Sequence, residues 1–169
     1  MITIEQIKAL LDLRRLSIEG GFFVESYRSA ETIPGQALPE RYGGARSHST
    51  AIYFLLTPDT CSALHRLRTD EVWHFYLGDP VELLQLAPDG SGQIVLIGTD
   101  LPAGQRPQVV VRRGLWMGAR LRPGGHLALL GTTMAPGFDP ADFEVGEREA
   151  LLAAYPGFRK MVLALTEAG

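Results

Sequence analysis

The sequence predicts an all-β fold with helices at both ends. Between residues 50 and 133, apolar stretches of strand length alternate with turn residues about every 8–12 positions, with no helical pattern between them. Glycine and proline account for 19 and 11 of the 169 residues, a frequency that suits turns better than long helices. Parallel βαβ units are excluded because each needs a crossover helix, so the pattern favours a β-sandwich or barrel.

The chain begins with a predicted helix over about residues 3–16. Thr3 and Gln6 have the spacing of a capping box, and apolar residues follow at helical intervals. After two glycines the pattern changes to β-type residues at 22–27, and a loop rich in proline and glycine follows up to about residue 44. The expected β-domain would span about residues 20–135.

The central strands and the helical tail follow in order. Eight strand-length stretches are expected, at residues 50–57, 62–67, 71–77, 81–86, 93–97, 108–112, 115–121 and 127–133. A helical tail is expected over about residues 140–167, because apolar residues lie three and four positions apart on both sides of Pro156. A chain of this length fits one domain, residues 1–169.

Charge and composition argue against several partners. Sixteen basic and nineteen acidic side chains give a net charge of −3 without a basic tract, so nucleic-acid binding is not expected. The apolar runs are too short to span a bilayer and the first residues do not resemble a secretory signal. We therefore expect a cytoplasmic protein that does not bind membranes. The single cysteine, Cys61, excludes an intrachain disulfide.

The segment 62–78 carries the clearest motif. His65 ends one expected strand, Glu71 opens the next, and Gly78 follows seven residues later. This spacing resembles the first motif of the cupin superfamily, His-x-His, three or four residues, Glu, six residues, Gly. Leu67 stands at the second histidine of that motif.

The flanking segments resemble one branch of that superfamily, often called cupin 5. The similar segments are residues 19–29, 50–56, 70–80, 114–116 and 135–138, and the resemblance covers roughly residues 3–145. It implies a double-stranded β-helix, or jelly roll, with the helices packed outside the barrel. It also implies a conical interior pocket, which we expect to be lined by His65, Glu71, Trp73 and Trp116.

We expect no tightly bound metal. The second cupin motif, Pro-x-Gly-x-x-His, matches this chain only at Gly114, and Met117 occupies its histidine position. A stable divalent site needs three or four protein ligands, and the side chains of Leu67 and Met117 do not bind a hard cation. Weak binding of a divalent metal by His65 and Glu71 is still compatible with the sequence.

Residues 21–27 also resemble a stretch of dTDP-4-dehydrorhamnose 3,5-epimerases that reads Arg-Gly-x-Phe-x-Glu, with Gly20 in place of the arginine. In those epimerases the phenylalanine and glutamate hold the nucleotide part of the substrate, and the histidine that matches His65 is the general base. The resemblance implies that His65 and Glu71 are catalytic. The ligand-binding residues that we expect are Phe23, Glu25, Tyr27, Arg28, Trp73, Trp116 and Met117.

Structural roles compete with these assignments. Most aromatic side chains of the strands belong to the core rather than to a ligand site. A partly buried Glu71 is costly without a partner or a wet pocket. The structural alternative is a hydrogen bond to a neighbouring backbone group or a salt bridge to Arg28 or Arg68. We favour a small-molecule pocket of the sugar or nucleotide-sugar type, in an isomerase or epimerase. A non-catalytic metabolite-binding protein and a metal-dependent oxygenase are the alternatives.

A homodimer is expected from the strand at 21–28. Its Phe22-Phe23-Val24 run is too apolar for an open sheet edge in a soluble protein. In the epimerases, the corresponding strand crosses to the partner subunit and completes its site. We therefore expect a C2 dimer that buries more than about 1,000 Å² and brings Glu25 or Arg28 close to the partner's pocket.

Overall fold

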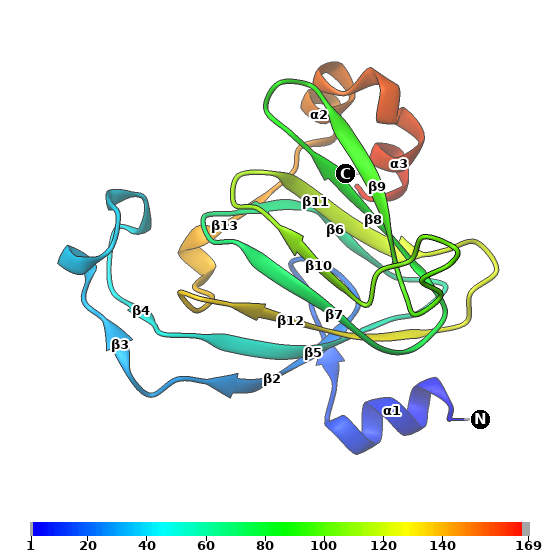
Figure 1. The fold of residues 1–169 in the computed structure, drawn as a ribbon, viewed down its shortest axis with the longest axis horizontal. Helices are drawn as coiled ribbons and strands as arrows, with labels where there is room; N and C mark the ends of the chain where they lie inside the picture. The colour runs from blue at the N-terminus through cyan, green and yellow to red at the C-terminus, as the bar shows by residue number, and fades with distance from the viewer. Residues whose placement is uncertain (1, 167–169) are drawn as a thin grey trace.

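Two antiparallel β-sheets face each other in the computed structural model, which describes residues 2–166 (Figure 1). The first sheet contains, in spatial order, β1 (Arg14–Arg15), β2 (Phe22–Arg28), β5 (Thr50–Leu56), β12 (Ala128–Met134), β7 (Glu71–Gly78) and β10 (Gln108–Val111). The second contains β13 (Phe143–Val145), β6 (Cys61–Leu67), β11 (Trp116–Leu121), β8 (Val81–Leu86) and β9 (Gly92–Ile97). The strands from β5 to β8 alternate between the two sheets, which is the predicted jelly-roll arrangement.

Each of the eight stretches expected between residues 50 and 133 contains a strand, so the all-β prediction is confirmed. The structure adds β13 and a small separate sheet of β3 (Thr32–Ile33) and β4 (Arg46–Ser47). Sequence periodicity did not predict these strands, because two or three residues are too short to show alternation. Three 3₁₀ turns lie in the connections: η1 (Gly35–Ala37), η2 (Glu40–Tyr42) and η3 (Pro140–Asp142).

The N-terminal helix is shorter than expected. The capping box forms, with Thr3 and Gln6 each bonding the other's backbone N–H, and α1 spans Ile4–Leu11. The helix ends where Asp12 adopts a left-handed conformation, with φ of 51°. Arg14 and Arg15 then pair with β2 instead of continuing the helix to about residue 16.

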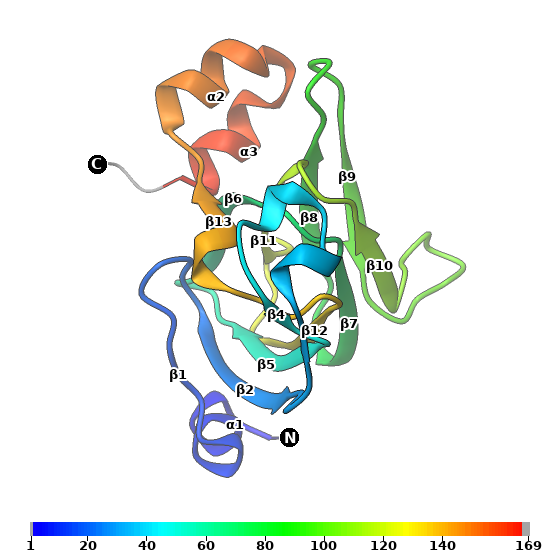
Figure 2. The same ribbon diagram turned by 90° about the vertical axis from the view of Figure 1, so that its left-hand side faces the viewer.

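The C-terminal tail forms the expected helices. They are α2 (Arg148–Ala154), the 3₁₀ turn η4 (Pro156–Phe158) and α3 (Arg159–Ala164), whereas residue 167 lies outside the described residues. Figures 1 and 2 show α2 and α3 on one side of the barrel and α1 on the opposite side, below β2 and β5. Within residues 2–166, none of the helices has the length and apolar character needed to span a bilayer.

Strand alternation decides which side chains form the core and which support the helices. In β5, Phe54 and Leu56 face the interior between the sheets, whereas Leu55 packs with Ile7 of α1 on the outside. In β6 and β8 the outward Leu64 and Leu84 pack against α2 and α3. The helices thus cover the outer faces of the two sheets and leave the interior to the strands.

Candidate functional site

A cavity of about 310 Å³ lies in the interior near the ends of β6, β7 and β2. Its polar lining consists of Glu19, Glu25, Arg28, Thr50, His65, Glu71 and Thr132. Its other lining residues are mainly apolar: Leu16, Ile18, Phe23, Ile52, Leu67, Met134, Phe138, Pro140 and Phe143. Few polar groups within apolar walls are typical of a small-molecule site.

His65 points from β6 into this cavity, and its position fixes the proton on one ring nitrogen. The side chain is buried, and its ring stacks on Phe143 with 4.8 Å between ring centroids. Nδ1 lies 2.7 Å from the backbone oxygen of Ala63. Because a carbonyl oxygen only accepts hydrogen bonds, Nδ1 carries the proton, and in the neutral ring the lone pair is on Nε2.

The Nε2 atom of His65 is available to a ligand. Among residues 2–166, no side-chain nitrogen or oxygen is sealed from solvent without a hydrogen-bond partner. Nε2 makes no hydrogen bond to these residues, so it is open to the cavity that His65 lines. A neutral imidazole with one free, accessible nitrogen is suited to accept a proton from a bound molecule.

Glu71 opens β7 and is only 7% exposed. Its Oε2 accepts a hydrogen bond of 2.8 Å from Nε1 of Trp73, and the Thr132 side chain also bonds the carboxyl group. Burial and then the charge of Glu19 raise its pKa from 4.5 to about 7, although His65 and the two hydrogen bonds act in the opposite direction. At neutral pH the carboxyl group is therefore present in both protonated and ionised forms.

Glu19 was missed by the sequence analysis as a site residue. It lines the cavity from the loop before β2, and its carboxylate accepts a hydrogen bond from the Ser62 hydroxyl. Gly20 makes this approach possible: its φ is +100°, and a Cβ there would collide with the backbone oxygen of Cys61. The Gly20-Gly21 pair was the only sequence signal for this loop path.

Three predicted ligand-binding residues of β2 line the same cavity as His65 and Glu71. They are Phe23, Glu25 and Arg28. Nε and Nη2 of Arg28 donate to the two carboxylate oxygens of Glu25 at 2.8 and 2.7 Å. Both side chains of this pair are partly exposed, so it forms a charged rim at the cavity.

The remaining predicted site residues do not line the cavity. Trp73 is buried behind Glu71 and reaches the site only through its hydrogen bond, and Met117 lies in the core beside His65 on the neighbouring strand β11. Tyr27 is 55% exposed. Neither of the salt bridges considered for Glu71 forms, because Arg28 pairs with Glu25 and the Arg68 guanidinium bonds the backbone oxygen of Arg41.

The predicted place of Trp116 on the cavity wall is wrong. Trp116 and Met117 are neighbours on β11, so their side chains point to opposite faces of the sheet. Met117 faces the interior, and Trp116 packs on the outside with the cluster that α2 and α3 cover. The guanidinium carbon of Arg66 lies 4.6 Å from its ring centroid.

The side chains present do not fit the metal centre of a complete cupin. Leu67 and Met117, at the two positions where the motifs have histidines, are buried in the hydrophobic core. Within residues 2–166, no group of three or more His, Cys, Asp and Glu side chains is arranged to hold a metal ion.

The jelly-roll topology, together with a motif histidine and a motif glutamate that line one interior cavity, defines a cupin. The family model of the cupin superfamily (DUF985) matches residues 5–146. The chain therefore belongs to this family.

Two solved structures share this fold along almost the whole of both chains, and a yeast protein is similar in sequence over part of its length. Protein SO0799 from Shewanella oneidensis has 34% identity and a TM-score of 0.88, with 100% of each chain covered. A hypothetical protein from Leishmania major has 29% identity and a TM-score of 0.88, covering 99% of this chain and 100% of that one. The uncharacterized protein YML079W of Saccharomyces cerevisiae is 30% identical over 141 residues, which cover 78% of this chain and 70% of the yeast protein.

A more distant likeness connects the chain to an enzyme of known fold. Oxalate decarboxylase from Bacillus subtilis has 15% identity and a TM-score of 0.52, and the match covers 92% of this chain but 38% of the decarboxylase. At this identity the likeness shows the shared cupin fold alone.

Proposed function

We propose that the cavity binds a small molecule of the sugar or nucleotide-sugar type and catalyses proton transfer next to a carbonyl group, as in an isomerase or epimerase. The observation that carries this proposal is the presence of two acid–base side chains, His65 and Glu71, in one cavity. The pKa of Glu71 is raised to about 7. In such a reaction, a base removes a proton from the carbon next to the carbonyl group, and a second group donates a proton to the carbonyl oxygen or to the carbon.

In this mechanism, His65 is the base. Nδ1–H stays on the Ala63 carbonyl while Nε2 takes the proton from the carbon of the substrate. Glu71, held by Trp73 and Thr132, acts as the second acid–base group, because its raised pKa keeps a transferable proton on the carboxyl group at neutral pH. The negative charge of Glu19 nearby favours the protonated form of Glu71.

His65→Asn should lower proton exchange about 100-fold and leave ligand affinity nearly unchanged. Asparagine keeps a nitrogen donor near the Ala63 carbonyl but provides no base. Ligands are first found by a thermal-shift screen of free sugars, sugar phosphates, nucleotides and nucleotide-sugars. A ligand at 100 times its Kd stabilises the folded protein by about 2.7 kcal/mol. Proton exchange next to the carbonyl of each ligand is then followed by NMR in heavy water.

His48→Asn is the matched control for this experiment, because His48 is an exposed histidine outside the cavity. It should exchange protons at the wild-type rate. Unchanged exchange in His65→Asn would refute His65 as the base. Binding without any exchange in the wild type would instead favour the non-catalytic metabolite-binding protein, and near-stoichiometric transition metal in the purified protein would favour the oxygenase.

We also propose a C2 homodimer formed along β2. Only Phe22 and Phe23 of this strand are covered, by the two residues of β1, so within the described chain the outer edge of residues 24–28 has no strand partner. Light scattering at about 10 μM should give a dimer, and Tyr27→Lys, at this edge, should give a monomer. Val110→Lys, on the opposite edge strand β10, is the control. A monomeric wild type would contradict the proposal.

A further inference from the structure

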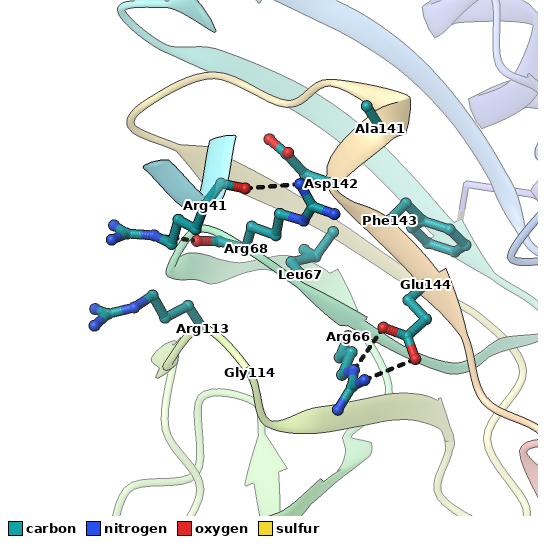
Figure 3. A pocket seen from close by; sticks show the side chains of 10 residues that line it. All are labelled: Arg41, Arg66, Leu67, Arg68, Arg113, Gly114, Ala141, Asp142, Phe143 and Glu144. Carbon is teal, nitrogen blue, oxygen red and sulfur yellow. Dashed lines mark hydrogen bonds and ion pairs between the residues drawn. The ribbon is translucent and has the colours of Figure 1, made fainter. Parts of the chain in front are cut away.

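A second pocket of about 360 Å³ adjoins the cavity and contains four arginines (Figure 3). Arg41 comes from η2, Arg66 from β6, Arg68 from the turn after β6, and Arg113 from the turn before β11. The chain as a whole carries a net charge of −3. Four arginines around one depression are therefore a local concentration of positive charge that the composition does not suggest.

The two acidic residues of this pocket are already engaged. Glu144 accepts hydrogen bonds from Nε and Nη2 of Arg66, both at 2.8 Å. Asp142 is buried and accepts from Nε and Nη2 of Arg46 at 2.8 and 2.7 Å. The charges of Arg41, Arg68 and Arg113 are not neutralised by either of these carboxylates.

The polar contacts of Arg41 and Arg68 hold the two side chains in place without cancelling their charge. Nε of Arg41 donates to the backbone oxygen of Arg68 at 3.1 Å, and Nη1 of Arg68 donates to the backbone oxygen of Arg41 at 2.7 Å. A carbonyl group is neutral, so both guanidinium charges remain. Each guanidinium also keeps further N–H donors for a ligand.

Arg113 leaves the most donors free. Its backbone N–H bonds Asp70, whose other carboxylate oxygen pairs with Arg112. The Arg113 guanidinium donates no hydrogen bond to residues 2–166, and in Figure 3 it extends from the same side of the pocket as the Arg41 guanidinium, without a dashed line. Charged side chains arranged this way favour a ligand with several anionic oxygens.

We propose that this arginine pocket binds the phosphate group of a small molecule. The planar donor forks of arginine match the oxygen pairs of phosphate. Asp70 offsets part of the charge of Arg113, whereas Arg41 and Arg68 form no ion pair within residues 2–166. Leu67 and Phe143 line both this pocket and the His65 cavity, so one layer of side chains separates the two. The phosphate site stands whether or not the neighbouring cavity is catalytic.

Calorimetric titration tests this site with three probes: inorganic phosphate, glucose 1-phosphate and glucose. Both phosphates should bind at one site per chain and weaken as salt is raised, because the attraction is electrostatic. Tighter binding of glucose 1-phosphate than of inorganic phosphate would identify a phosphorylated metabolite as the source of the group. Equal binding would identify free phosphate, and either result supports the site.

Arg113→Gln should reduce the affinity for both phosphates by about tenfold or more, the loss expected for one charge-assisted contact. The Arg113 side chain makes no hydrogen bond to residues 2–166 and acts on Asp70 only through its charge, so the substitution breaks no hydrogen bond within them. The matched control is Arg122→Gln, since Arg122 follows the far end of β11 and carries the same charge outside the pocket. Arg122→Gln should bind like the wild type.

Two results would overturn the phosphate site. One is the absence of saturable binding of either phosphate up to about 10 mM at low salt, where a surface anion site is strongest. The other is an equal loss of affinity in Arg113→Gln and Arg122→Gln, which would show a general charge effect. His65→Asn should bind phosphate like the wild type, so this proposal and the proposed catalysis can fail separately.

Discussion

Glu71→Gln should make the protein about 3 kcal/mol more stable than the wild type at pH 8 and should have little effect at pH 4. The pKa of Glu71 is about 7 in the folded protein against an ordinary 4.5, and each unit of difference corresponds to about 1.4 kcal/mol. A raised carboxyl pKa means that the folded state holds the proton more tightly than the unfolded state. The stability that protonation provides is thus complete below about pH 4.5 and is lost as the pH rises to about 7.

Urea unfolding at a series of pH values between 4 and 8 measures this difference. Glutamine resembles the protonated carboxyl group and does not titrate. The difference in unfolding free energy between variant and wild type should therefore grow as the pH rises from 4 to 8. Glu40→Gln, at an exposed glutamate of η2, is the control for a lost surface charge and should show no such gap. A gap that stays constant with pH would contradict the buried titration of Glu71.

The variant Glu19→Gln tests whether the charge of Glu19 contributes to the raised pKa of Glu71. The neighbouring charge of Glu19 raises the pKa of Glu71, so its removal should lower that pKa and narrow the pH range over which stability is lost. Burial is the larger cause and remains in this variant.

Asp142→Ala should cost about 3–5 kcal/mol of folding free energy, because it leaves a buried charge without its partner. The side chains of Arg46 and Asp142 are 5% and 0% exposed. Without Asp142, the guanidinium of Arg46 keeps hydrogen bonds to the backbone oxygens of Tyr42 and Ala45 but loses the carboxylate that it bonds directly. This ion pair joins β4 to η3, two residues before Glu144, and so holds the wall of the arginine pocket.

Glu144→Ala is the matched control, since Glu144 pairs with Arg66 in an exposed ion pair on the neighbouring strand. Exposed pairs contribute about 0–1 kcal/mol, so Glu144→Ala should unfold at nearly the same urea concentration as the wild type. Arg46→Met combined with Asp142→Leu should recover most of the stability, because it removes both charges together. Equal small losses in Asp142→Ala and Glu144→Ala would contradict the importance of burial.

The sequence was sufficient to predict an all-β sandwich or barrel because the central strands are long enough for turns and alternation to show. The resemblance to the cupin motifs then indicated the jelly roll. The same spacing placed His65 and Glu71 on adjoining strands that both face inward, and the structure brings them into one cavity. Trp116 was misplaced because the motif position was considered without strand alternation. Adjacent residues of β11 cannot both face the interior, and Met117 already does.

The place of Glu19 in the cavity and the arginine pocket could not be predicted from any local sequence pattern. Glu19 reaches the cavity only because the backbone at Gly20 turns through a conformation that glycine tolerates. The arginine pocket is assembled from η2, β6 with its following turn, and the turn before β11, which lie far apart in sequence. Only the antiparallel pairing of β6 with β11 and with β13 brings most of these side chains together.

The hydrogen bond from Trp73 to Glu71 gives the cavity its own optical reporter. The chain has two tryptophans, and indole emission responds to the charge beside its ring nitrogen. In Trp116→Phe, the remaining fluorescence would come from Trp73, whose Nε1 lies 2.8 Å from the Glu71 carboxyl group. The emission spectrum of that variant would follow the protonation of Glu71, and its change on ligand addition, directly and without an added dye.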